Sequence, residues 1–233
     1  NSGAKTLTTV PTISNILSLE GTATVSAAPT YGAAAALQYN TATSRIAGTE
    51  WINNFAATGG VIISNTGTIT LSANRTFTAT APLTVNSGAT LSMSTFTLAL
   101  NGNFINNGGT ASGTGTVTIA GTAPQNIGSF TTTGLVSITK TGGTATLTGN
   151  VFGGAFTLSG NGGTLNLGAA LTHTFTGTWT RTNGILNGGS SALRISGATS
   201  GTGGAFSAGT GTVEYFAAGP QTIASVLYNN LIL

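Results

Sequence analysis

The chain has 233 residues, of which 4% are charged, 36 are glycine, and none is cysteine or aspartate. Its formal charge of +3 comes from six scattered basic residues, which are too dispersed to neutralise a row of phosphates, so we expect no nucleic-acid partner. No apolar run approaches the ~18–20 residues that a membrane-spanning helix needs, and the opening NSGAKTLTT has no signal-peptide pattern.

Short alternating runs of β-branched and apolar residues follow one another along most of the chain and predict β-strands. No window shows a convincing helical period, so we expect little helix. Glycine pairs and Asn-Gly pairs separate the runs and predict tight turns. In chain order, the clearest runs are residues 68–71, 89–93, 144–149, 155–160, 164–168, 172–177, 178–184 and 192–197.

The segment LTHTFTGTWTRTNG, residues 171–184, carries threonine at every second position from Thr172 to Thr182. In an extended chain these hydroxyls share one side, opposite His173, Phe175, Trp179 and Arg181. Gly177 predicts a bend that divides the row into two strands. Such a row could bind ice or a crystal lattice. Threonine also has a high β propensity, and elsewhere its spacing is irregular, which favours a structural role with Phe175 and Trp179 as core or interface aromatics.

An internal repeat relates residues 112–137 to residues 208–233, at an offset of 96 residues. The weaker match between 66–70 and 114–118 has an offset of 48. Both offsets are multiples of 24, which predicts a β-solenoid with about 24 residues per coil rather than a sandwich. We expect residues 1–233 to form one continuous solenoid.

The two ends of the chain continue the same pattern. NSGATL at 86–91 resembles the opening NSGAKTL, and the final YNNLIL aligns with residues 132–137. Leu233 therefore reads as if another Asn1 should follow it. Neither end shows the polar capping repeat that a free-standing solenoid needs.

The order of motifs from about residue 40 onward, including NGNFINNGGTASGTGTVTIAGTAPQNIG, resembles the glycine- and threonine-rich repeat proteins that bacteria secrete. These are similar in style to haemagglutinin-type and autotransporter adhesins. The resemblance implies a right-handed parallel β-helix, an extracellular or cell-surface location, and a structural or adhesive role. It supplies no catalytic residues.

Catalysis would lack most of its usual groups. The only carboxylates are Glu20, Glu50 and Glu214, far apart in sequence, and the only histidine is His173, with no acid nearby. Glu50 and Trp51 beside Arg45 suggest a sugar site, but a structural pair is the commoner case. We therefore expect no enzyme, no cofactor and no metal site.

The leading hypothesis is an extracellular structural protein whose solenoid units stack head to tail into filaments or fibres. The units are either separate chains or pieces of one longer polypeptide. The alternative is a cell-surface adhesin module that binds glycans or abiotic surfaces through Trp51 or Trp179, and ice binding is a third reading. The predicted self-assembly residues are Leu7, Val10, Leu227, Tyr228, Leu231, Ile232 and Leu233.

Overall fold

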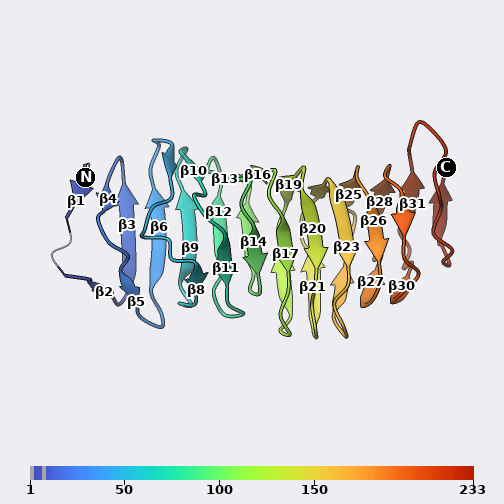
Figure 1. Cartoon of the computed structure of the whole chain (residues 1–233), viewed down its shortest axis with the longest axis horizontal. Coiled ribbons are helices and arrows are strands. Elements are labelled where there is room, and N and C mark those ends of the chain that lie inside the picture. The colour runs from blue at the N-terminus through green and yellow to red at the C-terminus, as the bar shows by residue number, and fades with distance from the viewer. Residues whose placement is uncertain (1–2, 7–8) are drawn as a thin grey trace. The chain divides into compact units, whose positions relative to one another are not determined.

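A computed structural model describes residues 3–6 and 9–233 of the chain. Over these residues the protein is an all-β parallel solenoid of about 11 turns, with roughly 20 residues per turn and no helix. The predicted β-solenoid is therefore confirmed. The chain divides into two compact units, residues 1–113 and 114–233, and strands of successive coils lie side by side within each unit (Figure 1).

The first unit contains three parallel sheets, A, B and C, and two separate strand pairs within its described residues. The pairs are β1 (Ala4–Lys5) with β4 (Thr24–Val25) and β2 (Thr12–Ile13) with β5 (Thr30–Tyr31). Sheet A contains β3 (Ile16–Glu20), β6 (Ala36–Asn40), β9 (Gly60–Ser64), β12 (Leu83–Asn86) and β15 (Phe104–Asn107). Sheet B contains β7 (Arg45–Ile46), β10 (Thr68–Thr70), β13 (Thr90–Ser94) and β16 (Thr110–Gly113). Sheet C contains β8 (Asn54–Phe55), β11 (Arg75–Phe77) and β14 (Leu98–Leu100).

The second unit also contains three parallel sheets, D, E and F. Sheet D contains β18 (Gln125–Ile127), β21 (Thr144–Leu147), β24 (Thr164–Asn166), β27 (Ile185–Asn187) and β30 (Ala205–Ser207). Sheet E contains β19 (Phe130–Thr132), β22 (Val151–Gly153), β25 (Thr172–Phe175), β28 (Ala192–Ile195), β31 (Thr212–Tyr215) and β32 (Asn230–Ile232). Sheet F contains β17 (Val117–Ile119), β20 (Leu135–Ile138), β23 (Ala155–Leu158), β26 (Trp179–Arg181) and β29 (Thr199–Ser200).

A full coil contributes one strand to each of three sheets, so a strand pairs with the third strand before it and the third after it, as β9 does with β6 and β12. The exception is β32, which pairs directly with β31. Residues 216–229 between these two strands form a long loop that contains no strand (Figure 1). The last described coil is therefore built differently from those before it.

Side chains that point inward stack in columns from coil to coil. In sheet A, Leu37, Val61, Leu83 and Phe104 face one another in register, and each is at most 1% exposed. Alternate residues of the same strands, such as Thr84, point outward. The period-two alternation that predicted the strands is therefore the alternation between core and surface. Burial of these apolar columns is the main stabilising contribution to each coil.

The length of a coil differs from the sequence prediction. The register shift is 24 residues from Ala36 to Gly60 but only 18 from Thr212 to Asn230, and the average is roughly 20. The predicted value of about 24 is too long. Parallel pairing fixes which side chains face the core, whereas turns at the corners can absorb insertions, so the coils need not share one length.

The repeat at an offset of 96 residues consequently does not mark equivalent places in the solenoid. Val117 lies in β17 of sheet F, whereas its counterpart Val213 lies in β31 of sheet E. Gln125 is buried in β18, but its counterpart Gln221 belongs to the loop at 216–229. Because 96 is not a whole number of turns of roughly 20 residues, the repeated sequence returns on another sheet.

The threonine row has the predicted geometry. It is divided between β25 and β26, with Gly177 outside both strands. Its six threonines are exposed or half-buried, whereas the side chains that alternate with them are buried. Of the two positions predicted for Phe175 and Trp179, core or interface, the structure shows the core, since they are 1% and 4% exposed.

Glycines at the corners allow adjacent coils to approach closely. A Cβ atom on Gly197 would lie 1.8 Å from the carbonyl oxygen of Gly177 one coil earlier, which no side chain can tolerate. Asparagine side chains close other turns: Asn166 Oδ1 accepts a hydrogen bond of 2.8 Å from the backbone N–H of Gly168. The abundance of glycine and asparagine therefore reflects the turns that join the strands.

Candidate functional site

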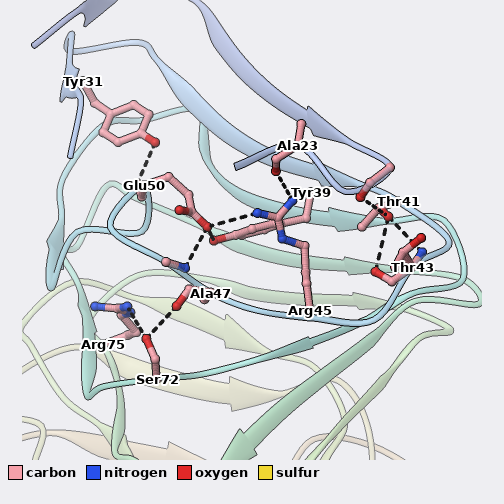
Figure 2. A network of polar contacts seen from close by, with 12 residues as sticks. Ala23, Tyr31, Tyr39, Thr41, Thr43, Arg45, Ala47, Glu50, Ser72 and Arg75 are labelled. Carbon is pink, nitrogen blue, oxygen red and sulfur yellow. Dashed lines mark hydrogen bonds and ion pairs between the residues drawn. The ribbon is translucent and has the colours of Figure 1, made fainter. Parts of the chain in front are cut away.

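The largest group of buried charged residues in the first unit surrounds Glu50, in the segment between β7 and β8. We call Tyr31, Tyr39, Arg45, Glu50 and Arg75 the Glu50 cluster (Figure 2). Glu50 is only 1% exposed. Its Oε1 accepts hydrogen bonds of 2.8 Å from the Tyr39 hydroxyl and the backbone N–H of Gly48. The carboxylate thus closes its own turn, and a Cβ on Gly48 would lie 2.5 Å from Oε2.

Two arginines balance the charge of this carboxylate. An amino nitrogen of Arg45 lies 3.9 Å from Glu50 Oε1, and the guanidinium also donates to the carbonyl oxygen of Ala23 (Figure 2). Arg75 donates to Asn53 Oδ1 at 2.7 Å and stacks over the Trp51 ring at 5.9 Å. These contacts join side chains from several coils into one buried network.

Burial controls the acid–base behaviour of the cluster. Burial, followed by the nearby Glu50 charge, raises the pKa values of Tyr31 and Tyr39 well above the ordinary value. Burial also lowers the pKa of Arg75. The tyrosines therefore stay protonated and remain hydrogen-bond donors: the Tyr31 hydroxyl donates to the backbone carbonyl of Glu50 at 2.8 Å. The arrangement holds the coils together rather than presenting a reactive group.

The two tryptophans predicted as glycan contacts lie in the core. Trp51 is 1% exposed and packs against Tyr39 and Phe77. Trp179 is 4% exposed and stacks on Phe156, with ring centroids 5.1 Å apart. Neither indole face is available to stack on a sugar, so the assignment of Trp51 and Trp179 as surface contacts is wrong. Both residues occupy inward positions of their coils, where large apolar side chains are buried.

His173 is fully buried in β25 and has two hydrogen-bond partners. Its Nδ1 accepts from the backbone N–H of Val151 at 3.2 Å, so Nε2 carries the proton and donates to the Leu167 carbonyl at 2.8 Å. Burial lowers the pKa of the imidazole, and the bond to Leu167 opposes this effect. His173 is therefore a packed, structural histidine.

Two further buried cations were not singled out from the sequence. Lys140 is 1% exposed, and its ammonium donates to Ala123 O at 2.8 Å and Gln125 Oε1 at 2.9 Å. Arg181, 4% exposed, points into the core from β26. Both follow a buried apolar residue at a spacing of two, Ile138 and Trp179. The period-two alternation of the sequence could have identified them, because it places both cations on the inner face of their strands.

The predicted self-assembly residues lie mostly in the last described coil. Leu7 falls outside the described residues. Val10 is 59% exposed, and Tyr228 is half-buried, with its hydroxyl 2.9 Å from that of Tyr215. The remaining four are exposed, by 85% for Leu227, 41% for Leu231, 51% for Ile232 and 76% for Leu233.

The outer face of sheet F carries a column of hydroxyl groups that follows five successive coils. The members face each other in register and are exposed or half-buried. The hydroxyls of Thr180 and Ser200 lie 2.9 Å apart. We call this set the hydroxyl column: Thr118, Ser137, Thr157, Thr180 and Ser200.

Comparison with known proteins adds no identity to these observations. No family model, curated protein or solved structure matches the chain. No helix that could cross a membrane occurs in the part of the chain that the structure describes. The fold shows that this chain is a β-solenoid protein.

Proposed function

We propose that this chain is a structural, non-enzymatic module of an extracellular fibre, in which solenoid coils stack end to end on further coils of the same kind. The observation that carries the proposal is the register column of Leu193, Val213 and Leu231 in sheet E. These residues are 3%, 7% and 41% exposed, although all three occupy the same inward position. A further parallel coil would bury Leu231 as its predecessors are buried.

Burial of such a leucine is worth about 1.5–3 kcal/mol. The outer edge of β32 also presents backbone groups that a parallel strand can pair with. The coil that docks there comes either from further residues of the same polypeptide or from a second chain. The resemblance to secreted glycine- and threonine-rich repeat proteins supports the extracellular location and the right-handed winding that we propose.

The test compares substitutions at two positions whose side chains are almost equally exposed. Leu231→Asp places a charge in the inward column of the last coil, whereas Ile185→Asp, at 40% exposure, places one on the outer face of β27. If coils stack at β32, electron micrographs and sedimentation of purified wild-type protein show filaments, which Leu231→Asp abolishes and Ile185→Asp retains. Equal assembly of the two variants, or a wild type that stays monomeric at high concentration, would contradict stacking between separate chains.

The same experiment, joined to mass spectrometry of native material under denaturing conditions, separates the two forms of the proposal. Separate chains give a species of 22.8 kDa. A much longer polypeptide places the stacked coils in one chain. In that case, a longer protein that includes the next coil should bury Leu231 and slow the exchange of its backbone amide with deuterium. Leu231→Asp should then lower the free energy of unfolding of this longer protein more than Ile185→Asp does.

A second candidate function is binding to a periodic solid surface such as ice, and the hydroxyl column favours it. Its members repeat at the strand spacing of about 4.8 Å over five coils, and none is charged. Thr157→Arg would break the column, and Thr146→Arg, on the outer face of sheet D, is the control. Ice crystals that the wild type and Thr146→Arg reshape but Thr157→Arg does not would support this candidate, whereas no effect of the wild type would eliminate it.

A further inference from the structure

The two lysines of the chain lie in opposite environments. Lys5 is exposed, whereas Lys140, which lies just after β20, is 1% exposed. In the described part of the chain, no carboxylate forms an ion pair with Lys140. A buried charge must be stabilised by other polar groups, because the interior replaces the water that would solvate it. The question is therefore which atoms take the place of that water.

Four oxygen atoms at one corner of the preceding coil surround the ammonium of Lys140. Its Nζ donates to the carbonyl oxygen of Ala123 at 2.8 Å and to Gln125 Oε1 at 2.9 Å. The carbonyl oxygens of Gly121 and Ala120 lie farther away, at 3.4 and 3.5 Å. All four atoms are amide oxygens without a formal charge. We call residues 120–125 the oxygen corner.

The following coil closes the site on its other side. A Cβ atom on Gly160 would lie 2.0 Å from the carbonyl oxygen of Lys140, and one on Gly163 would lie 2.3 Å from Lys140 Cβ. The two glycines thus let the backbone pack directly against Lys140. Burial lowers the pKa of the ammonium, and the oxygen corner offsets part of this cost by replacing its hydration shell.

Neutral oxygens are suited to a weakly hydrated monovalent cation. Backbone carbonyl oxygens replace the hydration shell of potassium in channel filters. Calcium and magnesium instead are bound largely through carboxylates, and residues 120–125 include neither aspartate nor glutamate. We infer that the oxygen corner is a site for a monovalent cation of the potassium or ammonium type, and that the tethered ammonium of Lys140 is its occupant.

Lys140→Ala tests this inference, because it removes the ammonium and leaves the four oxygens in place. Potassium is the probe. The unfolding temperature of this variant should rise with potassium chloride, by about 3–5 °C per tenfold increase once the site is occupied. Tetramethylammonium chloride keeps the ionic strength constant, since its cation is too large for the site. The wild type should not respond to potassium, and neither should Lys140→Met, whose side chain fills the space.

A second substitution tests whether the oxygen corner supplies the ligands. Gln125→Leu, added to Lys140→Ala, removes one of the two nearest oxygens and should reduce the potassium response. Gln38→Leu, added to Lys140→Ala, removes a half-buried amide of β6 instead and should leave the response unchanged. Crystals of Lys140→Ala soaked in rubidium, which replaces potassium and scatters anomalously, should show a peak in contact with Ala123 O and Gln125 Oε1.

Equal potassium responses in the wild type and Lys140→Ala, or rubidium-soaked crystals of the variant without this peak, would overturn the inference and show that water fills the corner. A Lys140→Ala protein that stays unfolded in every salt would also contradict it, because a bound cation should restore the contacts that the ammonium made.

Discussion

At the scale of single residues, three buried ionisable groups on the inner face of the solenoid are held by different kinds of partner. Glu50 is held by a tyrosine, a backbone N–H and an arginine. Lys140 is held by oxygen acceptors of the chain, and His173 by one donor and one acceptor. Polar groups so buried are stable only with their partners in place. Removing one partner should therefore cost more than removing an exposed pair.

Glu50→Gln keeps the shape of the side chain but removes the charge that faces Arg45 and lies near Arg75. We expect the free energy of unfolding to fall by about 3 kcal/mol, because the arginine charges then lack their carboxylate. Glu214→Gln, which disrupts the more exposed pair with Arg194, should have a much smaller effect. Urea unfolding of both variants measures the difference, and equal losses would contradict this account of the cluster.

The buried imidazole predicts a pH dependence of stability. Because burial lowers the pKa of His173, the folded state binds a proton less readily than the unfolded state does. Stability is therefore fully present above the unfolded pKa of about 6.5 and declines as the pH falls through the lower folded pKa. The chain contains no other histidine, no cysteine and no aspartate.

The measurement is the unfolding temperature as a function of pH, between about pH 8 and pH 5. The wild type should lose stability toward the acidic end. In His173→Leu the slope should be much smaller, even if the variant is less stable throughout. An unchanged slope in this variant would show that another group is responsible.

At the scale of strands and turns, coil spacing depends on glycines at which the backbone of the previous coil leaves no room for a side chain. Gly203 is one: a Cβ there would lie 1.8 Å from the Thr182 carbonyl oxygen. A Cβ atom on Gly219, by contrast, would have no other atom within 4 Å. The two glycines thus form a matched pair in the same unit.

Gly203→Ala should lower the free energy of unfolding by about 1–3 kcal/mol, because the backbone must move to relieve the overlap. Gly219→Ala should be neutral or slightly stabilising, since it restricts the unfolded chain without a clash. Thermal unfolding of both proteins provides the comparison. A neutral Gly203→Ala would mean that the corner turn can shift freely.

At the scale of the whole molecule, the stability of a solenoid is a sum of coil stabilities and interfaces between neighbouring coils. Within the second unit, β23 and β26 have a paired strand on both sides, whereas β32 pairs only with β31. We expect backbone amides of β32 to exchange with deuterium faster than those of β23 and β26. Stacking of a further coil should slow the exchange at β32 specifically. Uniform exchange across the unit would contradict this nearest-neighbour description.

The sequence by itself determined the class of fold and the orientation of most side chains. Alternation of period two places Phe175 and Trp179 inside and the threonines outside, and it holds equally for charged residues such as Lys140 and Arg181. This succeeds because the side-chain geometry of a strand is a local property of the backbone.

Only the tertiary structure decided which residues meet across coils. Register shifts of 18 to 24 residues cannot be read from a repeat of 96. The hydroxyl column, and the contacts that join Tyr31, Tyr39 and Arg75 to the sequence neighbours Arg45 and Glu50, therefore could not be predicted. The physical reason is that turns vary in length without changing the inward or outward direction of a strand's side chains. Contacts between coils depend on those turn lengths, whereas the fold class does not.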